Sequence, residues 1–169
     1  MSGLKTYEDY PRHTVGFCNA FSVATYVIGA FVVSEIGSIW LLPYLLLIVG
    51  LEIRLLRTSC TSCYYFGKWC AFGRGKISAL LFKRRDVRLF TDRKIDWKGL
   101  LPDLMVPLIP VVAGIVLLVL DFHWLILTAV ISLSLLATAG SGFVRGSLAC
   151  KMCRQREIGC PAQRFFTRK

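Results

Sequence analysis

The sequence predicts an all-α membrane protein with four transmembrane helices, arranged as two tandem, parallel-repeat helical hairpins that are each followed by a cytoplasmic cysteine segment. Three observations predict this fold class: four long apolar stretches, positive charges confined to one side of them, and a three-cysteine pattern that occurs twice. Hydrophobic residues make up 55% of the 169 residues, and the mean hydropathy is +0.58. This is more apolar than a soluble globular chain, so the bilayer is the expected environment of most of the chain.

Each of the four apolar stretches has about the length that crosses a bilayer. They cover about residues 15–36, 38–56, 101–120 and 122–144. A helix that rises 1.5 Å per residue needs roughly 20 residues to cross a hydrocarbon core of about 30 Å. These stretches have almost no polar face, which a helix in a soluble bundle would need. We therefore expect two pairs of spanning helices with tight turns near Gly37 and Asp121.

The first stretch could also be considered as a cleavable signal peptide. Its core is interrupted by Asn19, Ser22 and Thr25, and no small-x-small cleavage site closes it. A retained spanning helix is the expectation for this stretch.

The distribution of positive charge predicts the orientation. All 21 Lys and Arg residues lie before the first stretch, between Arg54 and Lys98, or from Arg145 onward. The turns inside the two hairpins therefore carry no positive charge. By the positive-inside rule, we expect a multi-pass protein of the cell membrane with both termini, the central loop and the cysteine segments in the cytoplasm.

An ungapped shift of 90 residues superimposes the two halves of the chain. It aligns three cysteines with three others at identical spacing, which scattered apolar identities between membrane helices do not explain. We expect a first repeat at residues 1–78, a basic amphipathic linker at 79–98 and a second repeat at 99–169. Because each repeat has an even number of helices, the copies would share one orientation, with a pseudo-two-fold axis along the membrane normal.

The linker mixes apolar residues with many basic ones. We expect its basic residues to contact anionic headgroups, where each surface cation contributes on the order of 1 kcal/mol. A solvated loop with a short helix is the alternative, and nothing favours nucleic acid as a partner. The expected membrane-surface residues are Lys83, Arg84, Arg85 and Arg88.

The spacing C-x2-C-x6-C occurs twice, at a predicted location where thiols are normally kept reduced, which favours metal binding over disulfides. Two thiolates of a C-x2-C pair bind one metal ion or cluster from a single turn, and a third closes the face. A fourth ligand would come from Cys18 or His13, from sharing between the segments, or from a dimer. The expected ligands are Cys60, Cys63, Cys70, Cys150, Cys153 and Cys160.

An iron-sulfur cluster is the first expectation and zinc the second. A three-cysteine set whose last member, Cys160, is followed by Pro161 resembles ferredoxin-like segments, although those have C-x2-C-x2-C spacing. Residues 150–160 also resemble the cysteine segment of RecB-type nucleases. That resemblance implies a cluster-binding geometry and no nuclease function, because the acidic active site of those enzymes is absent from this sequence.

The predicted function is an iron-sulfur electron-transfer or membrane-anchoring component without catalytic activity of its own. No Ser-His-Asp set or carboxylate pair has a spacing suited to hydrolysis. The alternatives are a zinc-stabilised structural membrane protein, a metal-handling transporter, and redox-active or lipidated thiols. The expected partners are the lipid bilayer, its anionic headgroups, and a second copy of the chain or a larger membrane complex.

Overall fold

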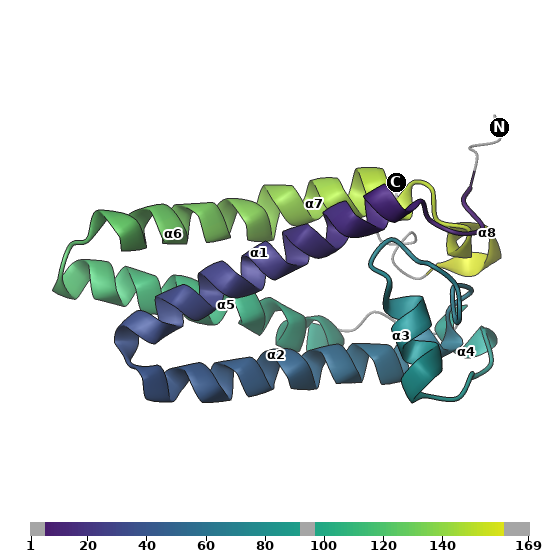
Figure 1. Cartoon of the computed structure of the whole chain (residues 1–169), viewed down its shortest axis with the longest axis horizontal. Helices are drawn as coiled ribbons and strands as arrows, with labels where there is room; N and C mark the ends of the chain where they lie inside the picture. Colours follow the sequence, from purple (N-terminus) through teal and green to yellow (C-terminus); the bar gives the residue numbers. More distant parts are fainter. Residues whose placement is uncertain (1–5, 92–96, 161–169) are drawn as a thin grey trace. The chain divides into compact units, whose positions relative to one another are not determined.

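The computed structural model describes residues 6–91 and 97–160, with the backbone alone for residues 97–100. Within these residues the chain is helical and has no β-strand, only a single parallel bridge between Tyr7 and Cys153. Figure 1 shows the helices in chain order. The principal helices are α1 (Arg12–Ile36), α2 (Ser38–Thr58), α5 (Trp97–Leu120) and α6 (Trp124–Leu135), the last of which continues through η2 (Leu136–Gly140), α7 (Ser141–Phe143) and η3 (Val144–Cys150).

Four of these helical segments are long and apolar enough to cross a membrane, which confirms the prediction of an all-helical chain with four candidate spans. They cover Arg12–Ile36, Ser38–Ser62, Leu101–Leu120 and Trp124–Cys150. The fourth extends past the predicted end at residue 144. Arg145 led the sequence interpretation to end the helix there, but a basic side chain is compatible with a helix that leaves the apolar layer.

Short connections join the helices of each hairpin, as predicted. Gly37 alone separates α1 from α2 and has φ of +155°, a backbone conformation that glycine adopts without a steric cost. Residues 121–123 separate α5 from α6.

The chain divides into two compact units, each of which takes residues from both predicted repeats. The apolar unit contains the described residues of 20–52 and 97–141. The cysteine unit contains those of 1–19, 53–96 and 142–169. The division into two repeats and a linker stays a prediction, and each compact unit combines residues of both halves of the chain.

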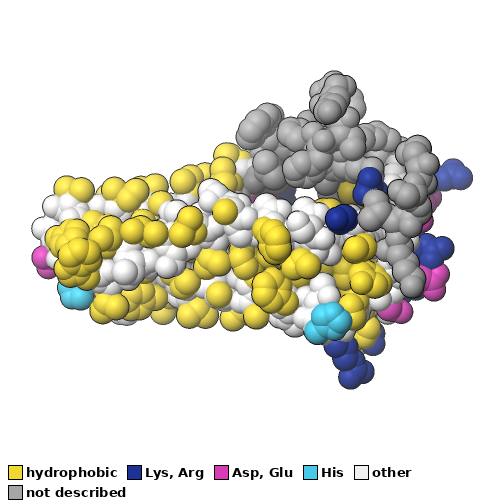
Figure 2. Space-filling model, turned by 90° about the horizontal axis from the view of Figure 1, so that it is seen from above, with side chains coloured by type: hydrophobic (Ala, Val, Ile, Leu, Met, Phe, Trp, Pro, Cys, Tyr) yellow, Lys and Arg dark blue, Asp and Glu magenta, His cyan; other side chains and the backbone are white. Residues whose placement is uncertain are grey.

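The apolar unit has a small core formed by α1, α2 and α5. Val33, Tyr44, Ile48 and Val106 are buried together. Many other side chains of these helices are apolar and exposed, up to 81% for Val119, which suits helices surrounded by lipid. Figure 2 shows hydrophobic side chains along the helices.

One hydrogen bond in this core follows directly from a proline. Pro110 has no N–H, so the carbonyl of Val106, four residues earlier, lacks its helical partner. The Tyr44 hydroxyl donates to that carbonyl at 3.0 Å. A Cβ at position 29 would lie 2.3 Å from the Tyr44 hydroxyl oxygen, so Gly29 makes the space for this bond.

Tyr44→Phe is expected to destabilise the bundle by about 1 kcal/mol, because it leaves the Val106 carbonyl unpaired in an apolar interior. Pro110→Ala restores an N–H at position 110, so the same Tyr44→Phe change should cost much less in that background. Unfolding of the four variants with sodium dodecyl sulfate in mixed micelles measures this cycle. An equal cost in both backgrounds would contradict the assigned role of Tyr44.

Candidate functional site

Three pieces of chain build the cysteine unit around the predicted ligands. The first cysteine segment (residues 60–70) begins with the short helix η1 (Cys60–Ser62), directly after α2. The second cysteine segment (residues 150–160) begins at the end of η3 and contains α8 (Gln155–Gly159). The N-terminal segment (residues 6–11) precedes α1. All three belong to one compact unit.

The two C-x2-C turns have the same backbone hydrogen bonds. In the first, the Cys63 N–H donates to the Cys60 carbonyl at 3.4 Å, and in the second Cys153 donates to Cys150 at 3.3 Å. Three positions further on, the Phe66 N–H donates to the Cys63 carbonyl at 3.2 Å, and the Arg156 N–H donates to the Cys153 carbonyl at 3.1 Å. These bonds correspond at the offset of 90 residues that the sequence predicted.

The two cysteine segments are joined by a reciprocal pair of hydrogen bonds. The Tyr64 N–H donates to the Gln155 side-chain oxygen at 2.7 Å, and the Arg154 N–H donates to the Tyr65 hydroxyl oxygen at 3.0 Å. Positions 64 and 154, like 65 and 155, differ by 90 residues. The accepting residues Tyr65 and Gln155 are only 2% and 1% exposed, whereas the hydrogen bonds as a whole are partly buried. The residues that follow Cys63 and Cys153 are thereby held against each other.

The N-terminal segment connects both cysteine segments as well. The Tyr7 N–H donates to the Met152 carbonyl at 3.0 Å, and the Tyr65 hydroxyl donates to the Tyr7 carbonyl at 2.5 Å. Glu8 forms an ion pair with Arg154. The backbone of residues 7 and 8 is therefore fixed between the two segments.

Tyr10 anchors the other end of the N-terminal segment. Its side chain is buried, its N–H donates to the Trp69 carbonyl at 2.9 Å and its hydroxyl donates to the Ala149 carbonyl at 2.5 Å. Its ring lies 5.5 Å from that of Tyr65, centroid to centroid. Burial of the neutral phenol, together with neighbouring thiols, raises the pKa of Tyr10 well above its usual range. The hydroxyl therefore remains a donor at physiological pH.

All seven cysteines are among the described residues, and none of them forms a disulfide. Cys18 is completely buried in α1, whereas His13 is exposed. The Cys70 sulfur accepts a hydrogen bond from the Gly75 N–H at 3.4 Å. A Cβ at position 75 would lie 2.1 Å from the Tyr65 carbonyl oxygen, so this contact depends on a glycine in the first turn of α3 (Arg74–Leu81).

The second cysteine of each C-x2-C pair has a strongly raised pKa. Burial, which disfavours the thiolate, raises the pKa of Cys63 to about 12, and thiolates at Cys60, Cys70 and Cys160 would raise it further. Burial likewise raises the pKa of Cys153 to about 12, with Cys63 first among the thiols that add to the effect. Thiols of both segments thus act on one another electrostatically.

The donor atoms do not form a ready metal centre in this arrangement. Among the described residues, no three His, Cys, Asp or Glu side chains lie close enough together to hold one metal ion. The six predicted ligands are therefore gathered in one unit, with the segments that carry them in direct contact, but their sulfur atoms are not arranged around a common point.

No protein-family model, curated protein or solved structure matches the chain.

Several residues that organise this site were not predicted as site residues. Tyr10 and Tyr65 are buried. Gln155 is a buried polar side chain whose oxygen accepts the hydrogen bond from the Tyr64 N–H. A signal for the first cysteine segment was present in the sequence, because two adjacent tyrosines follow Cys63 inside the x6 spacer. The role of the N-terminal segment had no such signal.

The predicted membrane-surface residues lie outside any long helix. Residues 83–86 are extended between α3 and the short helix α4 (Arg88–Thr91), and residues 92–96 of the predicted linker lie outside the described residues. Lys83, Arg84, Arg85 and Arg88 are all exposed.

Alkylation of Cys63 and Cys153 is expected to be at least about 100-fold slower in the folded protein than in the denatured chain at pH 8, because the thiolate is the nucleophile. The folded-state pKa lies near 12 and the ordinary value is 9.0, so the rate should rise steeply above pH 9. The raised pKa also contributes stability that is fully present below about pH 9 and is lost as the pH rises toward 12.

Iodoacetamide labelling followed by peptide mass spectrometry measures these rates residue by residue. The exposed Cys150 serves as the internal comparison. Equal rates for Cys63 in folded and denatured protein at pH 8 would contradict its burial.

Tyr65→Phe is expected to loosen the connection between the segments, because the Tyr7 carbonyl and the Arg154 N–H both lose their partner. The cost should be about 1 to 3 kcal/mol. Hydrogen exchange should become faster at Arg154. Tyr64→Phe is the matched control, since its hydroxyl contacts only the Lys68 ammonium among its described polar partners, at 3.2 Å. Equal exchange in both variants would contradict this role for Tyr65.

Proposed function

We propose that this multi-pass membrane protein uses its two cysteine segments as one shared thiol site for a thiophilic metal, with an iron-sulfur cluster as the first candidate and structural zinc as the second. The observation that carries the proposal is the reciprocal pair of partly buried hydrogen bonds after Cys63 and Cys153, which joins the two three-cysteine segments. Two independent sites would not need this contact.

Cysteine side chains are suitable ligands for a thiophilic metal, but their positions in this structure do not form a metal site. Cysteines in C-x2-C turns are usual protein ligands for zinc and iron-sulfur clusters. This chain has two such turns, and no cysteine in them forms a disulfide. Since no three described donors converge, binding requires the sulfur atoms to move closer together and to lose their protons. A cation beside Cys63 and Cys153 would stabilise their thiolates and so reverse the effect of burial on their pKa.

The proposal includes a tandem duplication of the hairpin and a cytoplasmic location for the site. The duplication is supported by the matching hydrogen bonds of the two C-x2-C turns at an offset of 90 residues. The location is supported by the confinement of Lys and Arg to one side of the four apolar stretches. In that compartment the thiols would be kept reduced, which is the state in which they bind metal.

Metal content of anaerobically purified full-length protein tests the proposal. A shared site predicts that Cys60→Ser with Cys63→Ser removes nearly all bound metal, and that Cys150→Ser with Cys153→Ser does the same. Tyr64→Phe is the comparison and should keep the metal, because it removes no thiol and its hydroxyl contacts the Lys68 ammonium. Iron with acid-labile sulfide and broad visible absorption would identify a cluster, whereas zinc alone would favour the structural role.

Two outcomes would contradict the proposal. Loss of only half the metal in each double variant would indicate two independent sites. Absence of metal from the wild-type protein purified without chelators would remove the metal-binding function itself.

A further inference from the structure

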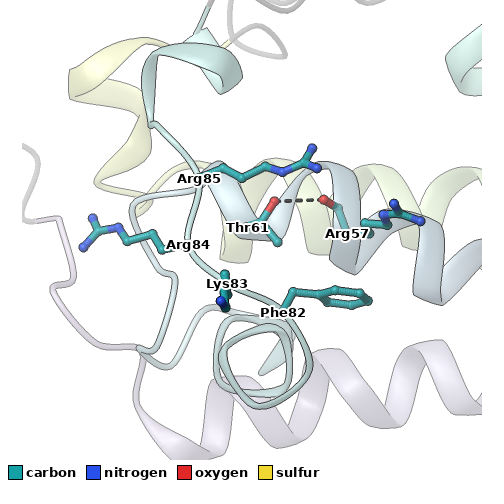
Figure 3. A pocket seen from close by; sticks show the side chains of 6 residues that line it. All are labelled: Arg57, Thr61, Phe82, Lys83, Arg84 and Arg85. Atoms are coloured by element: carbon teal, nitrogen blue, oxygen red, sulfur yellow. Dashed lines mark hydrogen bonds between the residues drawn. The ribbon is translucent and has the colours of Figure 1, made fainter.

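A basic pocket of about 330 Å³ lies within the cysteine unit, and no cysteine lines it. It is formed by the end of α2, the start of η1 and the extended residues after α3. Its lining residues are Arg57, Thr61, Phe82, Lys83, Arg84 and Arg85 (Figure 3).

Hydrogen bonds hold the residues that line this pocket in place. The Arg85 N–H donates to the Thr61 carbonyl at 2.9 Å, and the Thr61 hydroxyl donates to the Arg57 carbonyl at 2.8 Å. Thr61 is only 1% exposed. The completely buried Ser78 donates to the Leu56 carbonyl at 3.3 Å and so attaches α3 to the same end of α2. The extended residues are therefore held beside α2 by the protein itself.

Among the described residues, no acidic side chain compensates the charge of the pocket. Four of the six lining side chains are cationic, and none is acidic. The described carboxylates form no ion pair with any of these four cations. Asp86 follows directly in the chain, but its carboxylate accepts a hydrogen bond from the Arg88 N–H at 3.0 Å. In Figure 3, Arg57 and Arg85 extend toward the same side, while Arg84 extends toward the opposite one. Such an arrangement attracts a compact anion, which guanidinium groups bind with paired hydrogen bonds.

The surroundings of the pocket indicate which anion it takes. Arg57 lies in the last turn of α2, one of the helices long and apolar enough to cross a membrane. Directly before Phe82, the end of α3 presents Leu80 and Leu81, which are 86% and 61% exposed. Apolar side chains beside cations at the end of a spanning helix are typical of the membrane interface. A free anion in water would make no use of these leucines.

We propose that this pocket binds the phosphate of an anionic phospholipid, with Arg57 and Arg85 as its principal donors and Leu80 and Leu81 against the acyl chains. The headgroup contact is then a discrete site that includes Arg57 of α2, in addition to the diffuse attraction of the basic linker. This inference depends on α2 spanning the membrane and is independent of metal binding by the cysteines.

Titration of full-length protein in a neutral detergent with dioctanoyl phosphatidylglycerol tests the site, with bound lipid counted by native mass spectrometry. Saturable binding is expected, and Arg57→Gln or Arg85→Gln should each weaken it about fivefold, with about 25-fold for both together. Arg12→Gln removes the same charge from an exposed position outside the pocket and the basic linker, and should leave the affinity unchanged. Lys83→Gln, a further exposed lining residue, replaces either arginine variant if that variant does not fold.

Two comparison ligands separate the sources of phosphate. Dioctanoyl phosphatidylcholine, which carries a compensating positive charge, is expected to bind at least about fivefold more weakly. Inorganic phosphate that binds as tightly as the anionic lipid would overturn the lipid assignment and leave a free-anion site. An equal weakening by Arg12→Gln and Arg85→Gln, or binding that does not saturate, would overturn the discrete pocket.

Discussion

The structure of the apolar unit depends on one requirement: every backbone polar group inside a layer without water must have a hydrogen-bond partner. Only a helix pairs its own N–H and C=O groups without help, so the long apolar stretches form helices that end at short turns. Pro110 has no N–H for the Val106 carbonyl, and the Tyr44 hydroxyl donates to that carbonyl instead. That replacement in turn requires Gly29, since a Cβ there would collide with the Tyr44 hydroxyl. One absent N–H thus determines the residues on two neighbouring helices.

The cysteine unit meets the same requirement by different means, because its segments are too short to pair their own backbone groups. Buried side chains act as the partners: the Tyr65 hydroxyl and the Gln155 amide take the N–H groups that follow the two C-x2-C turns. These contacts need no long-range sheet or helix, and they hold the two cysteine segments against each other. Burial then keeps Cys63 and Cys153 protonated, so the unit is stable without a charge that it cannot pair.

The sequence predicted the parts of the structure that depend on local pattern. Long apolar runs predicted the four helices, and Gly37 marked one of the turns. The contact between the cysteine segments could be predicted only as a consequence of topology, because nothing in the spacing says that Tyr65 meets Arg154, 89 residues later. The N-terminal segment was beyond prediction for the same reason, since Tyr10 acts through partners distant in the chain. Cysteine spacing indicates which residues can be ligands. The distances between their sulfur atoms depend on packing, and no three of these cysteines lie close enough together to hold one metal ion.

The pair Tyr65 and Gln155 gives the strongest reason to treat the two cysteine segments as one functional element. The residues occupy equivalent positions at the 90-residue offset, and each accepts an N–H from the opposite segment, although one is a phenol and the other an amide. Two unrelated segments would meet in this reciprocal way only by coincidence, whereas copies related by a two-fold axis meet so by symmetry. In the shared site that we propose, three cysteines per copy would be sufficient, because a two-fold axis doubles the number of thiols available to one centre. Under that proposal, the absence of a fourth cysteine from each segment is the expected composition of half a site.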